Sequence, residues 1–144
     1  MLMPDVNVLV YAHREDEELH EAYADWLKRL VDGAEPFSLS VLVAVGFVRV
    51  VTNQRIYADP TPLPVALAAI DQLVAHDGCR VATPGPGHLE VFARLCRSVD
   101  ARGPLVADAQ HAALAIAEGC TWVTRDRDFG RFESAGLRWE LLNL

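Results

Sequence analysis

The stretch PLVADAQHAALAIAEGCTWVTRD, residues 104–126, carries the pattern that decides the fold. Pro104 suits the first position of a helix, and Gly119 lies where a left-handed residue commonly ends one. Together they bound the clearest helix of the chain, over residues 104–118. A short apolar strand over 121–123 follows directly. The stretch therefore predicts one helix–strand unit of an α/β fold.

The rest of the chain repeats this alternation. We expect strands over residues 1–6, 37–39, 80–82, 121–123 and 137–142. We expect helices over residues 18–31, 41–53, 63–76, 86–98 and 104–118, the second of them capped by Ser40. Helices between short strands predict an α/β fold with a mostly parallel sheet and helices on both of its faces. Pro/Gly-rich connectors at 59–62 and 83–87 predict loops within a single domain of residues 1–144.

The composition is that of an ordinary globular domain, with 144 residues, 51% of them hydrophobic and 23% charged. The longest apolar run, Val41 to Val48, is too short to span a membrane. The opening Met1 to Pro4 does not have the pattern of a signal peptide. We therefore expect a soluble cytoplasmic protein without a membrane partner. Three widely spaced cysteines predict buried reduced thiols: Cys79, Cys96 and Cys120.

The net charge of −7 is unfavourable for binding nucleic acid, because positive charge drives phosphate binding. Lys28 is the only lysine, so nearly all the positive charge is arginine, whose planar guanidinium suits phosphate. Five arginines lie close in sequence to the acidic motifs described below: Arg49, Arg102, Arg125, Arg127 and Arg131. Each is either a phosphate contact or a solvated surface charge, and the sequence leaves both interpretations open.

Three aspartates stand where ligands bind in such folds, beyond the carboxyl ends of the strands. Asp5 lies at the end of the first predicted strand, and Asn7 points to the same side if the extended geometry continues. Asp126 follows the fourth strand, with Asp128 two residues later. Asp108 lies early in its helix, where the positive end of the helix dipole favours an ionised carboxylate. The acids are therefore candidates for one common site.

Carboxylates that converge on one point repel each other and raise one another's pKa unless a cation holds them. Hard oxygen ligands of this kind select Mg²⁺ or Mn²⁺, which orients a water and neutralises a phosphate. The alternative is three unrelated surface or capping acids. Spacing alone does not decide between these interpretations.

Three ordered motifs favour the common site. The opening Met-Leu-Met-Pro-Asp5-Val-Asn7-Val-Leu-Val-Tyr11-Ala resembles the start of PIN-domain proteins. The segment Leu105-Val-Ala-Asp108-Ala-Gln-His-Ala112-Ala-Leu-Ala115 resembles their third acidic motif, and Val123-Thr124-Arg-Asp126-Arg-Asp128-Phe129 is similar to the fourth. Each motif alone is weak, but their order and spacing match along essentially the whole chain. The resemblance implies a PIN-like three-layer α/β/α sandwich.

The chain length and the segment from Phe47 to Asn53 look most like the VapC toxins of bacterial toxin–antitoxin pairs. That resemblance implies a Mg²⁺- or Mn²⁺-dependent endoribonuclease that cleaves RNA, is usually a homodimer, and is held inactive by a small VapB-type antitoxin. It also implies that Asp5 and Asp108 are the principal metal ligands. Asp126 would complete the site directly or through water, and Asp128 would assist it. The net charge of −7 fits a basic antitoxin better than free RNA.

One position departs from the family pattern. The second acid of the family is usually a glutamate in the helix after the second strand, and here that position is Gly46. The remaining acids either suffice, with water in the vacant place, or the nuclease is weakened or inactive. Arg49 is expected on the same helix face and is a candidate contact to the substrate phosphate, or else an ion-pair partner of the acids. Asn7 and Thr124 are further candidates for phosphate contacts.

Other functions stay open at this point. Gly46 motivates a PIN-like module that binds RNA or protein without cutting it. A phosphoacceptor receiver-type domain has a similar size and sheet, but Asp5 lacks the acidic neighbour that such a domain uses. Phosphatases of the haloacid-dehalogenase type fail similarly, because Asn7 replaces their second aspartate. His111, three residues after Asp108, is expected to pack beside the site rather than to act in it.

Overall fold

A five-stranded sheet with strand order β3-β2-β1-β4-β5 forms the centre of the computed structural model, which describes residues 1–144. Its strands are β1 (Leu2–Pro4), β2 (Phe37–Ser40), β3 (Cys79–Ala82), β4 (Thr121–Thr124) and β5 (Arg138–Leu141). Every pair of neighbouring strands is parallel, as the alternation of helices and strands predicted. All the strands consequently end at the same edge of the sheet, and this edge carries the acids discussed below.

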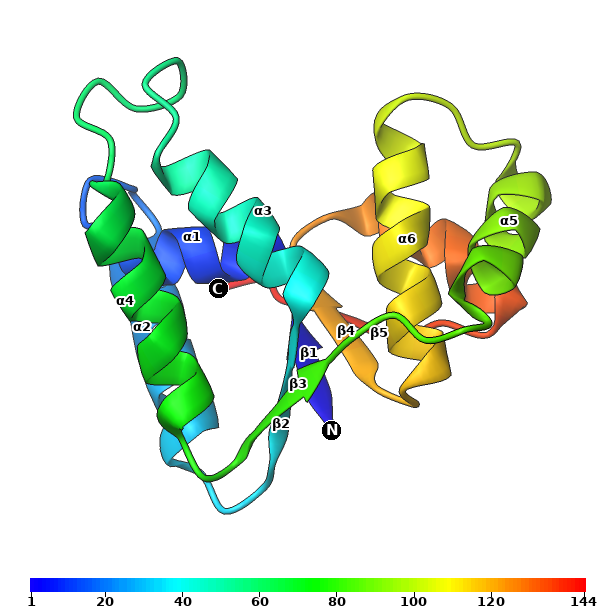
Figure 1. The fold of residues 1–144 in the computed structure, drawn as a ribbon, viewed down its shortest axis with the longest axis horizontal. Coiled ribbons are helices and arrows are strands. Elements are labelled where there is room, and N and C mark those ends of the chain that lie inside the picture. Colours follow the sequence, from blue (N-terminus) through cyan, green and yellow to red (C-terminus); the bar gives the residue numbers. More distant parts are fainter.

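Six α-helices and one 3₁₀ segment connect the strands (Figure 1). They are α1 (Val6–His13), α2 (His20–Asp32), α3 (Val41–Val51), α4 (Leu63–Ala75), α5 (His88–Val99), α6 (Pro104–Ala117) and the 3₁₀ segment η1 (Arg127–Ala135). Figure 1 shows α1 to α4 gathered in one half of the molecule and α5 and α6 in the other. No helix combines the length and the apolar character that crossing a membrane would require.

Consecutive residues of β4 show that helices cover both faces of the sheet. Val123 packs in a small buried cluster with Val8 of α1 and Tyr23 of α2. Trp122 faces the opposite side, where its ring stacks on His111 of α6 and contacts Phe129 of η1. Because successive side chains of a strand point to opposite faces, these contacts place one helical layer on each side. The three-layer α/β/α arrangement expected from the sequence is therefore confirmed.

The expected strand over residues 1–6 is wrong in its second half. The strand ends at Pro4, and α1 begins at Val6, so Asn7 lies in a helix and not in extended chain. The β-branched run after Asp5 has little helix propensity, but the packing of α1 against α2 and α3 overrides that preference. Asp5 itself is the N-cap of α1, and its carboxylate accepts the Val6 N–H at 2.6 Å. The 3₁₀ segment η1 was not expected at all.

Two predicted helix boundaries are confirmed by their capping geometry. The Ser40 hydroxyl accepts hydrogen bonds from the N–H groups of Leu42 and Val43 at 3.1 and 3.3 Å, so it caps α3. Gly119 has a φ of 65°, the left-handed conformation expected after α6. The helix expected to reach Asn53 instead ends at Val51, and the other boundaries differ by one or two residues.

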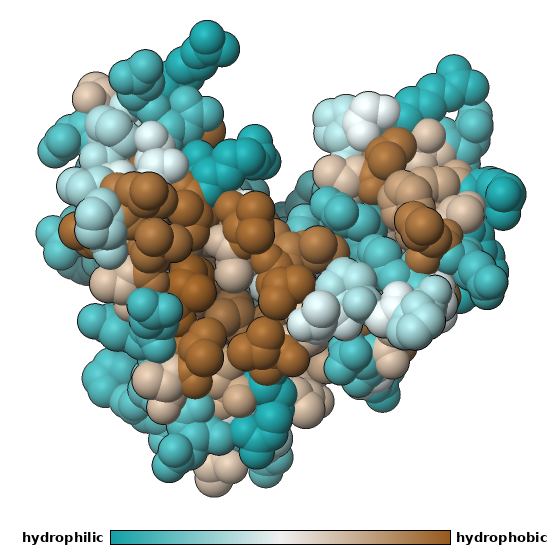
Figure 2. Space-filling model, in the orientation of Figure 1, coloured by the Kyte–Doolittle hydropathy of each residue, from teal (hydrophilic) through white to brown (hydrophobic).

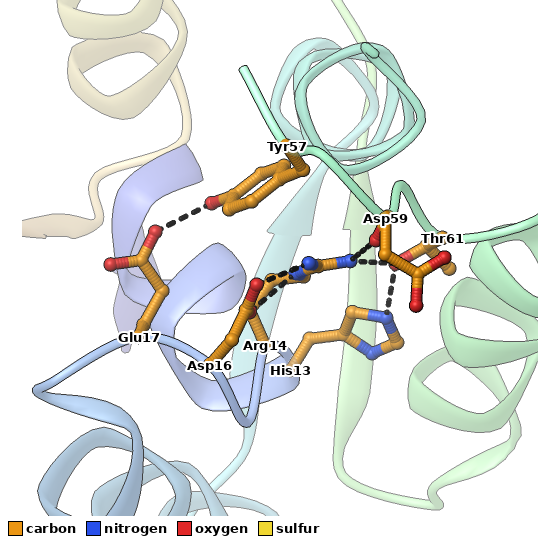
Figure 3. Close-up of polar contacts among 7 residues, drawn as sticks. All are labelled: His13, Arg14, Asp16, Glu17, Tyr57, Asp59 and Thr61. Atoms are coloured by element: carbon orange, nitrogen blue, oxygen red, sulfur yellow. Dashed lines mark hydrogen bonds and ion pairs between the residues drawn. The ribbon is translucent and has the colours of Figure 1, made fainter.

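Arg14, at the end of α1, ties the connection between α3 and α4 to the rest of the fold (Figure 3). Its guanidinium binds Asp16 and donates to the Asp59 carbonyl at 2.9 Å and to the Thr61 hydroxyl at 3.2 Å. It also lies over the ring of Tyr57, 4.0 Å from the centroid. The side chain is buried, so these contacts satisfy a charge that would otherwise be costly to bury. They fix the position of α4 against α1.

Candidate active site

Asp5 is held in place from two sides. One carboxylate oxygen accepts the Val6 N–H, and the other accepts the Thr124 hydroxyl at 2.6 Å. The side chain is buried at the junction of β1, α1 and β4. Burial raises the pKa of Asp5 to about 6, although both hydrogen bonds act to lower it and the charge of Asp126 adds to the rise. Asp5 is therefore a carboxylate whose position the fold itself determines.

Thr124 connects Asp5 to the second acid. Its side chain is completely buried, and its hydroxyl accepts the Asp126 N–H at 3.0 Å while it donates to Asp5. Asp126 in turn accepts the Asp128 N–H at 2.8 Å and caps η1. The Thr124 hydroxyl thus holds both Asp5 and the Asp126 N–H, and its expected contact with a substrate phosphate stays a prediction.

Asp108 is the third acid, and it lies in the second turn of α6, half-buried. Burial, together with the smaller effect of the charges of Asp126, Asp5 and Asp128, raises its pKa to about 6. The Thr124 hydroxyl links Asp5 to Asp126, and Asp126 and Asp128 line the same cleft as Asp108, so the four carboxylates lie close together. The structure therefore brings together Asp5, Asp108, Asp126 and Asp128, which the sequence predicted from separate motifs.

A cleft of about 440 Å³ opens beside these acids. It is lined by Asp100, Arg102, Pro104, Leu105, Asp108, Asp126, Asp128 and Arg131. Arg102 and Arg131 are the only basic residues in this lining, and the sequence offered both only among five arginines that are either phosphate contacts or solvated surface charges. The available signal was their nearness in sequence to Asp108 and Asp128, which Arg125 and Arg127 share. The path of the backbone places Arg102 and Arg131 in the cleft and Arg125 and Arg127 outside it.

The position of the missing acid is filled by the fold. A Cβ atom built on Gly46 would lie 2.9 Å from the Cγ2 atom of Val6, so α3 approaches the first turn of α1 too closely for an unshifted side chain. Val6 directly follows Asp5 in the sequence. The gap expected at Gly46 is consequently occupied by the Val6 side chain.

The remaining sequence-predicted residues lie outside the acidic cleft. Arg49 lines a different hollow, between α3 and α4, and it is not among the residues that line the cleft. Asn7 is exposed on the first turn of α1, so its contact with a phosphate stays a prediction. His111 stacks on Trp122 with ring centroids 5.3 Å apart, which confirms that it packs beside the site. Burial lowers its pKa to about 4, so the ring is neutral at pH 7.

The acids suit a divalent cation in their chemistry. Their carboxylate oxygens are the hard ligands that Mg²⁺ and Mn²⁺ prefer, and the pKa values of Asp5 and Asp108 are raised chiefly by burial, with neighbouring carboxylates adding to the rise. No three acidic, histidine or cysteine side chains are already arranged to hold a metal ion. Asp126 and Asp128 are exposed, so their side chains are able to turn toward a cation.

Comparison with known proteins identifies related chains along nearly the whole sequence. Residues 2–134 match the family model of the PIN domain. Ribonuclease VapC43 of Mycobacterium tuberculosis is 45% identical over 139 residues, which are 96% of this chain and 93% of the relative. Ribonuclease VapC31 of the same species is 40% identical over 134 residues, 93% of this chain and 94% of the relative. These matches support the resemblance to VapC proteins noted in the sequence.

Solved structures share the fold at low sequence identity. VapBC2 from Rickettsia felis, solved with a DNA fragment from its promoter, gives a TM-score of 0.71 at 18% identity and covers 99% of this chain and 98% of that one. The Mycobacterium tuberculosis toxin VapC20, described as cleaving the sarcin–ricin loop, gives a TM-score of 0.66 at 16% identity, with 95% and 96% covered. At such identities the likeness concerns the fold alone.

Proposed function

We propose that this chain, which belongs to the PIN-domain family and within it to the VapC ribonucleases, is the endoribonuclease toxin of a toxin–antitoxin pair. Cleavage depends on Mg²⁺ or Mn²⁺, and a VapB-type antitoxin neutralises the toxin. The convergence of Asp5, Asp108 and Asp126 from three separate elements on one edge of the sheet is the observation that carries the proposal.

The acids divide the work of the site between them. Asp5 and Asp108 hold the cation, Asp5 from a fixed position and Asp108 from a half-exposed one. Asp126 uses one oxygen to accept the Asp128 N–H, which leaves its second oxygen to bind the cation or to orient a water toward the phosphate. When bound, the cation supplies a more acidic water and neutralises charge on the phosphodiester. Asp128 assists Asp126 at the mouth of the cleft.

The decisive experiment is the substitution Asp108→Asn, which we expect to leave the fold intact. We expect RNA cleavage by Asp108→Asn to fall at least about 100-fold, because a neutral amide binds a divalent cation much more weakly than a carboxylate does. Cleavage of total cellular RNA, measured by mapping new RNA ends with and without Mg²⁺ or Mn²⁺, checks this expectation. Asp71→Asn is the matched control, since Asp71 is exposed on α4 and lies outside the cleft.

A second candidate function follows from the contact between Gly46 and Val6. Because the family's second acid is absent and its place is filled, a PIN-like module that binds RNA or protein without cutting it is the alternative. Wild-type protein that binds RNA but produces no new ends under any divalent cation would establish that alternative. Wild-type cleavage that Asp108→Asn retains in full would show that the acidic site is not the catalytic one.

An apolar surface supports the part of the proposal that concerns protein partners. Figure 2 shows apolar side chains gathered over α3 and α4, in the half of the molecule that does not carry α5 and α6. A hollow of about 370 Å³ between these two helices is lined by Ala44, Val45, Val48, Arg49, Leu67 and Ile70. Val45 and Leu67, which line this hollow, are 70% and 47% exposed, and a contiguous exposed apolar patch is typical of a protein–protein interface. We propose that VapB-type antitoxin binding and homodimer formation use this half of the molecule.

Replacing Val45 by Glu tests the role of this surface without touching the acidic cleft. We expect the variant to fold normally, because the side chain is exposed, and to lose a protein–protein contact through the burial of a charge. Light scattering of the purified chain reports the homodimer, and co-purification with the small protein encoded beside it reports the antitoxin. If Val45→Glu leaves both assemblies unchanged, this surface is not the interface.

A further inference from the structure

Two arginines line the same cleft as the acids. Arg102 lies in the connection between α5 and α6, and Arg131 lies in η1. Both line the cleft that Asp108, Asp126 and Asp128 also line. The two guanidiniums therefore reach the same space from elements that are separate in the fold.

The connection that carries Arg102 has unusual backbone geometry. Asp100, which ends α5, is the only residue other than glycine with a positive φ, at 49°. Gly103 has a φ of 57° and a ψ of −127°, a combination that only glycine adopts readily. These two positions turn the chain sharply, and Pro104 then starts α6. This sharp turn places Arg102 in the lining of the acidic cleft.

The position of Arg131 is fixed by buried neighbours in η1. Phe129 and Phe132 are almost completely buried, and Phe129 packs against Trp122 of the sheet. Arg131, between them in sequence, is exposed. The backbone of η1 is therefore anchored by aromatic packing, while the guanidinium faces the cleft and solvent.

Neither arginine is committed to a strong partner within the protein. Arg102 forms an ion pair with Asp100 at 3.0 Å, but both side chains are more than 80% exposed, so solvent screens the pair and its contribution to stability is small. Arg131 has no ion pair. Both guanidiniums are consequently available to an anion that enters the cleft.

The charge of the lining explains why an anion would need them. Four carboxylates and two guanidiniums line the cleft and leave it with two negative charges. With Asp5 beside this lining the site carries three negative charges, and one divalent cation reduces them to one. Without Arg102 and Arg131 the same cation would leave three negative charges, which would repel a phosphodiester chain more strongly. The arginines are therefore what makes the acidic cleft compatible with a nucleic-acid backbone.

We propose that Arg102 and Arg131 form a phosphate-binding pair that holds the backbone of a single RNA strand beside the acids. This inference rests on the proposed ribonuclease function. It gives the role of phosphate contact to these two residues in place of Arg49, which lines the hollow between α3 and α4. Planar guanidiniums suit this task, because each is able to bind two phosphate oxygens at once.

The test measures binding of a fluorescein-labelled single-stranded oligouridylate by fluorescence anisotropy over a range of KCl concentrations. All proteins carry Asp108→Asn, so that the probe is not cut. We expect Arg102→Gln and Arg131→Gln each to weaken binding about five- to tenfold and to reduce the slope of log K against log salt by about 0.7. Arg102→Lys and Arg131→Lys should restore the slope, because they restore the charge.

Arg55→Gln is the matched control, since Arg55 is an exposed arginine outside the cleft and its loss changes the net charge equally. The inference is overturned if the two cleft variants weaken binding no more than Arg55→Gln does. Cleavage of total RNA by proteins with an intact Asp108 separates this failure from that of the proposed function. Asp108-dependent cleavage with normal binding by the arginine variants overturns only the inference, whereas a wild-type chain that neither binds nor cuts RNA overturns both.

Discussion

Asp5 and Asp108 have the same raised pKa, about 6, and burial is the largest cause at both, but their neighbours act on them differently. Asp5 sits at the end of β1, buried and hydrogen-bonded by Thr124 and the Val6 N–H, and burial is the main cause of its shift. Asp108 sits on α6, half-exposed, and three neighbouring carboxylates add to the effect of its burial. The first carboxylate is fixed by the protein, and the second is perturbed by its neighbours.

The difference indicates how such a site is assembled. The fold buries Asp5 whether or not a cation is bound. The hydrogen bonds from Thr124 and the Val6 N–H reduce the free-energy cost of this burial. Repulsion at Asp108 disappears as soon as a cation neutralises the cluster. Asp5 therefore sets where the site is, and Asp108 makes the site responsive to metal.

The largest expected effect is a difference between Asp5 and Asp108 in how the free energy of unfolding depends on pH. A carboxyl group whose pKa is raised on folding binds more protons in the folded state, so its contribution to stability is fully present below about pH 4 and is lost as the pH rises through 6. For Asp5 this loss is about 3 kcal/mol, at 1.4 kcal/mol per pKa unit. For Asp108, which is half-exposed, it is smaller. Urea unfolding between pH 4 and 7.5 measures both.

The matched variants are Asp5→Asn and Asp108→Asn, each of which removes one titrating group. We expect the difference between wild type and Asp5→Asn to depend strongly on pH. The difference between wild type and Asp108→Asn should depend on pH only weakly without metal, and Mn²⁺ should stabilise wild type more than Asp108→Asn. Equal pH dependence of the two differences would mean that Asp5 and Asp108 are destabilised by their surroundings to the same extent.

The second effect concerns the hydrogen bonds that fix Asp5. Thr124→Val keeps the shape of a completely buried side chain but removes the hydroxyl that serves Asp5 and the Asp126 N–H. We expect a loss of about 2 kcal/mol in the free energy of unfolding, because a buried carboxylate loses a donor. The pKa of Asp5, followed by NMR, should rise further above 6. Thr52→Val, whose hydroxyl only donates to the Val48 carbonyl, is the control.

A Thr124→Val protein as stable as the control would place the energetic support of Asp5 elsewhere. Such a result would leave the N–H of Val6 as its main partner and would make the two acids more alike than their geometry indicates.

The sequence predicted the acids better than it predicted their surroundings. Asp5, Asp108 and Asp126 follow from ordered motifs, and the parallel sheet follows from alternating patterns, because both signals are local in the chain. The helical start of α1 was missed because its β-branched residues prefer strands and only tertiary packing makes them helical. Arg102 and Arg131 were not distinguished from other arginines, because only the backbone turns at Asp100 and Gly103 bring Arg102 to the cleft.

The smallest effect is expected from Gly46→Glu, which adds a carboxylate beside Asp5. The surroundings of Asp5 then become more like those of Asp108. Gly46→Glu should lower the free energy of unfolding by about 1 kcal/mol, because the clash of the new Cβ with Val6 exceeds the helix propensity gained. Adding Val6→Ala removes the obstructing methyl groups and should recover most of that loss. In the double variant we expect the pKa of Asp5 to rise and Mn²⁺ binding, measured by calorimetry, to tighten. Val6→Ala alone controls for the space created. If the double variant binds Mn²⁺ no better than Val6→Ala, the position of Gly46 lies outside the reach of the metal, and the missing acid costs this chain nothing.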